Sequence, residues 1–153
     1  MPDGPSVDVT VNVACEAPAA DVGLLRTAVL RTIAGNQADG AEVPRGGEVS
    51  LTLVDDDAIR AINRDFLGKD RVTDVIAFSL GEGGRLLGDV YVGVEQADRQ
   101  AVELGVDPAE ELVRLAVHGT LHVLGHDHPE GEERDRSPMY EFQERLVRDI
   151  LAD

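Results

Sequence analysis

All four histidines of this sequence lie in one segment, HGTLHVLGHDH, at residues 118–128. His118 and His122 are four positions apart, so on a helix they project side by side from one face. Two imidazoles placed in this way can bind one metal ion, and Gly125 can end the helix so that the chain turns back and brings His128 to the same ion. Three neutral imidazoles without a thiolate are typical of a catalytic zinc site that keeps one coordination position open for water. We therefore predict one Zn²⁺ per chain, bound by His118, His122 and His128, while a site of nitrogen ligands alone also suits nickel, copper or iron.

Two other residues of this segment limit the chemistry. Gly119 occupies the position at which zinc peptidases of the HExxH type carry their glutamate general base, so the usual peptidase mechanism lacks its proton acceptor. Because a glycine inside a helix costs about 1 kcal/mol relative to alanine, Gly119 also indicates that another backbone or a substrate comes close to the helix. His126 is expected to support the site or to lie at the surface, and Asp127 is expected to be the partner of an imidazole.

The helix that carries the histidines has clear boundaries in the sequence. Asp107 can cap it, Pro108 suits its first position, and Glu110 follows the cap by three residues, as in a capping box. Gly125 is a natural C-terminal cap. Because this helix is apolar on nearly every face, we expect it in the middle of the domain.

The remaining pattern predicts an α+β fold, a four-stranded mixed β-sheet packed with about five helices, with the metal site on a central helix. Alternating apolar and β-branched residues predict the strands, GEGG predicts the turn of an antiparallel hairpin, and amphipathic spacing predicts the other helices. GNQADGAEVPRGGE is expected to be a surface loop. The expected strands are 7–13, 49–54, 73–79 and 85–94, and the expected helices are 20–34, 55–67, 95–104, 107–125 and 139–151.

Length and composition indicate one globular domain, residues 1–153, with a net charge of −16. Such a charge disfavours diffuse binding to nucleic acid or to anionic membranes, so an RNA partner would need a local basic patch. The best candidate is the segment from Arg60 to Arg71, which also holds Arg64 and Lys69. A single cysteine, Cys15, rules out an intrachain disulfide, and no apolar run is long enough to span a bilayer. We expect a soluble cytoplasmic protein without a membrane partner.

The sequence resembles the YbeY-type rRNA maturation factors, whose hallmark is HGxLHxxGxDH. HGTLHVLGHDH matches every specified position, and INRDFLGKDRVTDVIAFSL at 62–80 and LLGDVYV at 86–92 extend the resemblance over most of the chain. The resemblance implies a metal-dependent endoribonuclease, specific for single-stranded RNA, that processes the ends of small-subunit ribosomal RNA and takes part in ribosome quality control. It implies the small ribosomal subunit and its proteins as partners, and His118, His122 and His128 as the metal ligands. The family commonly has an arginine where this chain has Leu67.

In the leading hypothesis, the metal polarises a phosphoryl oxygen or activates water, while Arg60, Arg64 and Lys69 stabilise phosphate charge. Asp74 is a candidate to orient or deprotonate the water, or else an acid at the start of a strand. Two alternatives stay open. One is a non-catalytic ribosome assembly factor that the metal stabilises, for which Leu67 is expected, and the other is a zinc hydrolase of amides or esters.

Overall fold

The computed structural model describes residues 6–38, 40–42, 44–81, 83–127 and 137–153. Within them the elements follow the predicted order of strands and helices, and the α+β class is confirmed. The strands are β1 (Val7–Val13), β2 (Gly47–Val54), β3 (Val75–Ser79) and β4 (Leu86–Gly93). The helices are α1 (Val22–Ala38), α2 (Asp56–Leu67), α3 (Val94–Leu104), α4 (Pro108–Val123) and α5 (Pro138–Ala152).

The four strands form one mixed sheet in the order β1-β2-β4-β3. β1 pairs with β2 and β2 with β4 in parallel, whereas β3 and β4 form the predicted antiparallel hairpin, with Val75 opposite Val92. β3 is therefore an edge strand. Its start, just after Asp74, lies at the same end of the sheet as the end of β4.

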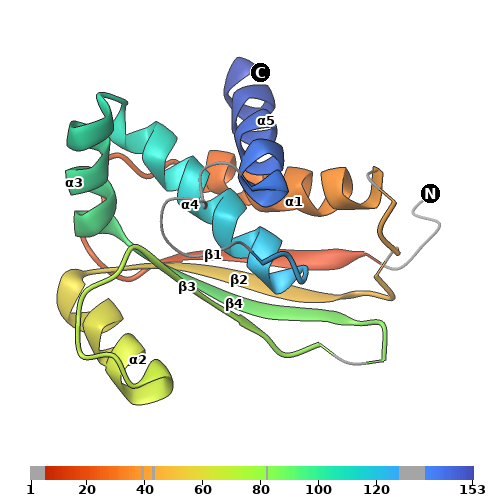
Figure 1. Ribbon diagram of the computed structural model, residues 1–153, viewed down its shortest axis with the longest axis horizontal. Coiled ribbons are helices and arrows are strands. Elements are labelled where there is room, and N and C mark those ends of the chain that lie inside the picture. The colour runs from red at the N-terminus through yellow and green to blue at the C-terminus, as the bar shows by residue number, and fades with distance from the viewer. Residues whose placement is uncertain (1–5, 39, 43, 82, 128–136) are drawn as a thin grey trace.

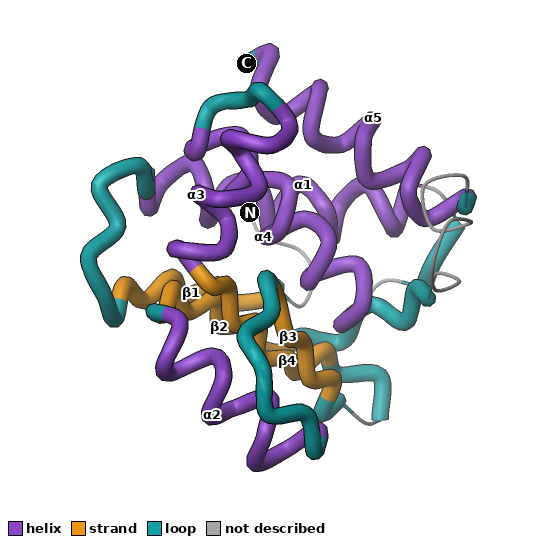
Figure 2. The backbone as a smooth tube through the Cα atoms, turned by 60° about the vertical axis from the view of Figure 1, so that its left-hand side comes forward, coloured by secondary structure: helices purple, strands orange, loops and turns teal. Residues whose placement is uncertain are grey.

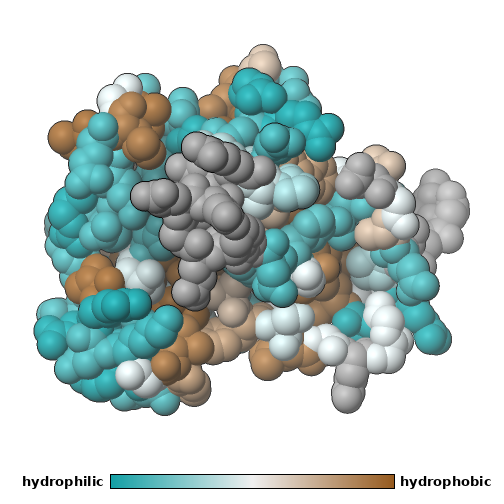
Figure 3. Space-filling model, viewed as in Figure 1, coloured by the Kyte–Doolittle hydropathy of each residue, from teal (hydrophilic) through white to brown (hydrophobic). Residues whose placement is uncertain are grey.

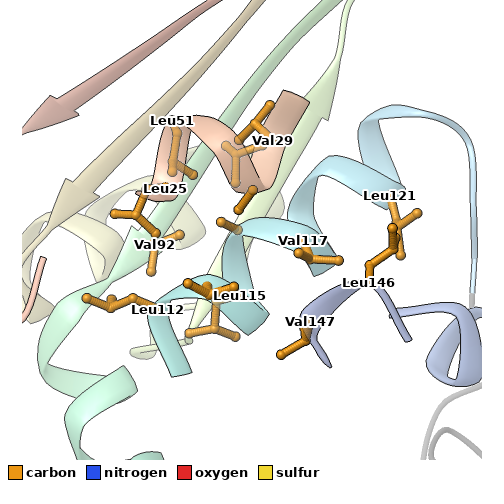
Figure 4. Packing of buried hydrophobic residues seen from close by; sticks show 14 of the residues in the cluster. Leu25, Val29, Leu51, Val92, Leu112, Leu115, Val117, Leu121, Leu146 and Val147 are labelled. Carbon is orange, nitrogen blue, oxygen red and sulfur yellow. The ribbon is translucent and has the colours of Figure 1, made fainter. Parts of the chain in front are cut away.

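Helices cover the two faces of the sheet unequally (Figure 1). α1, α3, α4 and α5 lie on one face, and α2 lies alone on the other. The larger core joins the sheet to the four helices, with Leu25, Leu51, Val92 and Leu121 fully buried in it (Figure 4). The smaller core, beneath α2, is built on Val54, Ile59 and Ile76.

Helix α4 is central, as its nearly uniform apolarity predicted, and it lies unusually close to the sheet. A Cβ on Gly119 would lie 2.4 Å from Cγ1 of Val90 on β4, and a Cβ on Gly88 of β4 would lie 2.4 Å from Cγ1 of Val123. Side chains at either position would push α4 away from the sheet. The close approach expected at Gly119 is therefore to the sheet.

Helix α1 continues beyond residue 34, where we expected a loop to begin, and ends at Ala38. The turn-forming residues there are held by tertiary contacts. Gly35 gives room to Leu146 of α5, whose Cδ2 would be 2.9 Å from an added Cβ, and the buried Asn36 accepts a 2.7 Å hydrogen bond from Nε2 of His126. Packing thus outweighs the low helix propensity of Gly-Asn.

The predicted cap of α4 was only partly right. Asp107 is the N-cap residue, but its side chain makes no capping hydrogen bond. Glu110 does not complete a capping box with it, and its carboxylate accepts a hydrogen bond from Arg114. In α2, by contrast, the Asp55 carboxylate accepts from the backbone N–H of Ala58, as expected of a cap. No helix in the described part of the chain is long and apolar enough to cross a membrane.

Candidate metal centre and its surroundings

His118 and His122 lie side by side on α4, one turn apart. Their Nε2 atoms are 3.0 Å from each other, and their rings meet edge to face with centroids 4.6 Å apart. Two nitrogens that share a zinc ion at about 2.0–2.1 Å lie at a comparable separation. The pair therefore has the donor type and the spacing to bind one ion.

The two rings differ in their surroundings. The His118 residue is only 6% exposed, and its Nδ1 donates a 2.6 Å hydrogen bond to Oε1 of Gln143 on α5. His122 is half-buried, and its Nδ1 is 4.0 Å from the carboxylate of the exposed Asp127, too far for a hydrogen bond. The described residues thus place Asp127 near an imidazole, without the bonded contact that would make it a firm partner.

The chain leaves α4 through a Schellman turn at Gly125. The backbone N–H of Gly125 donates to the carbonyl of His122 and that of His126 to the carbonyl of Leu121, while Gly125 has a positive φ of 97°. The His126 ring is directed to Asn36 of α1 and lies beside Phe142 of α5, with centroids 5.8 Å apart. His126 therefore fastens the turn to α1 and α5.

The third predicted ligand, His128, lies outside the described residues. Among those that are described, no group of three or more His, Cys, Asp and Glu side chains could hold a metal ion. Metal binding by His128 therefore stays a prediction.

A cavity of about 370 Å³ opens beside His118. Its lining includes Asp74, Glu111, Arg114, Gln143 and Glu144 with His118, and its apolar wall includes Leu104 and Leu115. Asp74 is thus the one predicted catalytic residue that shares this cavity with His118. It directly precedes β3, and its Oδ1 also accepts a 2.8 Å hydrogen bond from the backbone N–H of Val75.

Among the described residues that line this cavity Arg114 is the one cation, and three carboxylates hold it. Glu144 receives two hydrogen bonds from it, at 2.9 and 3.1 Å, while Glu111 and Glu110 receive one each, at 2.9 and 3.0 Å. Burial opposes its charge, but these bonds outweigh burial and hold the pKa of Arg114 above its ordinary value. Burial likewise opposes ionisation of Glu144, yet hydrogen bonds from Arg114 and Gln143 lower the pKa of Glu144. With its charge shared by three acids, Arg114 is poorly suited to bind phosphate.

The predicted basic residues lie elsewhere. Arg60 and Arg64 are on α2, on the opposite face of the sheet from α4, and Lys69 is in the loop that follows (Figure 2). None of these three basic residues lines the cavity beside His118. Arg60 donates to Asp70 and Arg64 to Asp65, at 2.8 and 2.9 Å, and these hydrogen bonds raise the pKa of both arginines.

One loop connects these basic residues with the cavity beside His118. The loop after α2 climbs along the sheet edge to the start of β3 and ends at Asp74, which lines the cavity (Figure 2). At the other end of this loop Phe66 is 70% and Leu67 49% exposed, and hydrophobic surface is visible beside α2 (Figure 3). The Phe66 ring meets that of Phe78 edge to face at 5.7 Å.

Sequence reasoning missed Gln143, Glu144 and Arg114. A signal for Arg114 was present, because it is four residues before His118 and hence on the same face of the helix. Gln143 had none, since its contact with His118 joins two helices that are 25 positions apart in the chain. Gly119 gains a second meaning, because the sheet leaves no room for the glutamate side chain of a zinc peptidase at this position.

Fold and site together define an α+β protein whose central helix presents a histidine pair beside an acidic cavity. The sequence model of the family described as "Endoribonuclease YbeY" matches residues 19–151. Relatives of that same name are 42% identical over 110 residues in Persephonella marina and 44% identical over 122 residues in Geobacillus kaustophilus. These matches cover 69% and 72% of this chain, and 71% and 74% of the relatives. The chain belongs to the endoribonuclease YbeY family.

One solved structure is also similar. A solution structure of a protein from Thermotoga maritima superimposes with a TM-score of 0.61 at 25% sequence identity, covering 95% of this chain and 89% of that one. The similarity therefore extends over the whole arrangement of sheet and helices.

Proposed function

We propose that this protein is a metal-dependent endoribonuclease that cleaves single-stranded RNA and acts in the maturation of small-subunit ribosomal RNA. The observation that carries the proposal is the His118–His122 pair, with its Nε2 atoms 3.0 Å apart, in a chain of the endoribonuclease YbeY family. Its relatives' name supports RNA as the substrate.

In this proposal His118, His122 and His128 bind one zinc ion. The donor set fits, because two imidazole nitrogens already lie at a ligand-like separation and an all-nitrogen set without thiolate suits a catalytic zinc. The bound ion would supply Lewis-acid activation of a phosphoryl oxygen or of water. His126 is assigned no part in this binding, because its ring is directed to Asn36.

Asp74 is the proposed proton acceptor. It is a carboxylate that lines the same cavity as His118, which supports a role in accepting a proton from water or in orienting it. The competing role is structural, since one of its oxygens accepts the N–H of Val75. The variant Asp74→Asn keeps an acceptor for that N–H and removes the basic group, so it separates the two roles.

Arg60, Arg64 and Lys69 are the proposed phosphate contacts. The segment 60–71 carries four basic and two acidic residues in a chain of net charge −16, which makes it locally attractive to a polyanion. Lys69 and Arg71 form no ion pair with the described residues, and the loop that holds them leads to Asp74. RNA bound in the cavity would extend along this loop toward α2.

The direct test is cleavage of a labelled single-stranded RNA by the zinc-loaded protein, next to the same RNA in a duplex. We expect cleavage of the single strand only, and its loss in His118→Ala. His126→Ala is the matched control, since it removes a histidine of the same segment that is directed away from the pair. Equal cleavage by wild type and His118→Ala, or none by wild type, would contradict the proposal.

A non-catalytic assembly factor is the second candidate, favoured by Leu67 at the position of the family's arginine. Both candidates include cytoplasmic binding to the small ribosomal subunit and its proteins. Co-sedimentation with purified small subunits tests that binding, and binding without RNA cleavage would favour the second candidate. An amide or ester hydrolase of the HExxH kind is disfavoured by the lack of room at Gly119.

A further inference from the structure

We propose that Gln143, oriented by Glu144 and Arg114, fixes His118 in the tautomer that carries its proton on Nδ1, and so leaves the Nε2 lone pair ready to bind a metal ion. This inference rests on the metal-binding role of His118 proposed above. It assigns positioning roles to three residues that the proposed function does not use. Hydrogen bonds link these side chains in a row, and the donors and acceptors that each group offers set the direction of every bond.

The row begins at Arg114, which can only donate. Its Nε and Nη2 donate to the two oxygens of Glu144, at 2.9 and 3.1 Å, so this bidentate pair fixes the orientation of the carboxylate. Hydrogen bonds to Glu110 and Glu111 hold the guanidinium from α4 itself. Side-chain exposures of 17% for Arg114 and 19% for Glu144 leave little water to compete.

Gln143 comes next, and Glu144 decides which way its amide faces. An ionised carboxylate only accepts, so the amide nitrogen of Gln143 must face it, as observed in the 3.0 Å bond from Nε2 of Gln143 to Oε2 of Glu144. Turning the amide over would set two oxygens against each other in a residue that is only 4% exposed. The carbonyl oxygen Oε1 is therefore committed to the opposite side, where His118 lies.

The last hydrogen bond of this row, between Gln143 and His118, sets the tautomer of His118. Because Oε1 of Gln143 can only accept, Nδ1 at 2.6 Å must carry the proton. A neutral imidazole has one N–H, so Nε2 is then the lone-pair donor, and it is Nε2 that lies 3.0 Å from Nε2 of His122. A histidine without such a partner populates both tautomers and must give up one of them before it can bind an ion through Nε2.

The main variant is Gln143→Leu, which removes the acceptor, and the second is Glu144→Gln, which keeps the volume but lets the Gln143 amide face either way. Gln37→Leu is the matched control, because Gln37 is a partly buried glutamine on α1 that does not line the cavity. Long-range ¹H–¹⁵N NMR of the metal-free protein, at a pH where the ring is neutral, reads the tautomer. Chelator competition measures zinc affinity, and urea unfolding of the metal-free protein measures stability.

We expect a proton on Nδ1 of His118 in wild type and in Gln37→Leu, and a mixture of tautomers in both test variants. Loss of a supporting partner of this kind weakens metal binding by about 10- to 100-fold, whereas a merely structural role would change only the unfolding transition. A wild-type proton on Nε2, or unchanged tautomer and affinity in both variants, would overturn the inference. A protein that binds no zinc but shows the expected tautomers would instead refute the proposed metal site alone.

Discussion

Arginine–carboxylate pairs occur on both faces of the sheet, and they differ in almost everything except residue type. On the face covered by α4 and α5, Arg114 is 17% exposed and bound to three acids, one of them 3% exposed. On the other face, Arg60 and Asp70 of the α2 region form one pair with side chains 53% and 56% exposed. The buried cluster can hold a neighbouring side chain in one orientation, whereas the exposed pair can exchange its partner for another anion. The first arrangement suits positioning and the second suits binding.

Replacing Arg114 is the strongest test of this difference between the buried and the exposed ion pairs. Arg114→Leu leaves Glu110, Glu111 and Glu144 close together without a counter-charge, and we expect it to lower the free energy of unfolding by about 2–4 kcal/mol, somewhat less than a fully buried pair would cost. Arg60→Leu, the matched change on α2, should leave that free energy unchanged. Urea unfolding followed by circular dichroism measures both. Equal effects would mean that burial does not separate the two faces.

Disturbing the close packing of α4 on the sheet should give the next largest loss of stability. Gly119→Ala places a methyl group 2.4 Å from Cγ1 of the fully buried Val90, and we expect a loss of about 1–3 kcal/mol from overpacking. In Gly23→Ala, at the exposed start of α1, the nearest atom is 3.5 Å away, so stability should be kept or slightly raised. Thermal unfolding of the two variants compares them directly. A stable Gly119→Ala protein would show that α4 can shift, and would weaken the steric argument against a glutamate at this position.

What the sequence could predict follows the same division between local and distant interactions. The bounds of α4, the pairing of His118 with His122 and the turn at Gly125 are set by residues within a few positions of one another, so their spacing was enough. The length of α1 depended on contacts with Leu146 and His126, which no local pattern contains. The orientation of Gln143 is likewise a product of helix packing.

The basic segment shows a third case. The sequence gathered Arg60, Arg64 and Lys69 correctly into one segment, but a helical pattern cannot say on which side of a sheet its helix packs. The structure puts α2 opposite α4, so these residues reach the cavity only by way of the loop that ends at Asp74. A role for them in RNA binding therefore depends on a substrate long enough to follow that loop.

Acid provides a smaller effect that again separates the faces. Since hydrogen bonds hold the folded-state pKa of Glu144 below its ordinary value of 4.5, its contribution to stability is present above that value and is lost as the pH falls through the folded-state pKa. Unfolding measured from neutral pH down to pH values below 4.5 should show a shallower loss in Glu144→Gln than in wild type. Asp70→Asn should retain the wild-type slope. The hydrogen bond from Arg60 lowers the pKa of Asp70, but both side chains are more than half exposed and solvent screens their interaction. The reverse order of the two slopes would contradict the assignment of the buried cluster.

The smallest effect per residue is expected for RNA binding by the α2 region. If Arg60, Arg64 and Lys69 each contact one phosphate, replacing any of them with glutamine should reduce the slope of log affinity against log salt concentration by about 0.7 for single-stranded RNA, without change in stability. Arg31→Gln is the matched control, since Arg31 is also an exposed arginine in an ion pair, with Asp153, but lies on α1. Fluorescence anisotropy of a labelled RNA at several salt concentrations, with zinc-free protein so that the strand stays intact, measures the slope. If Arg31→Gln and Arg60→Gln reduce it equally, RNA responds to the charge of the whole protein and α2 is no binding surface. If only the variants of the α2 region reduce the slope, the two faces have different roles. The buried cluster orients a histidine, and the exposed arginines exchange Asp70 and Asp65 for phosphate.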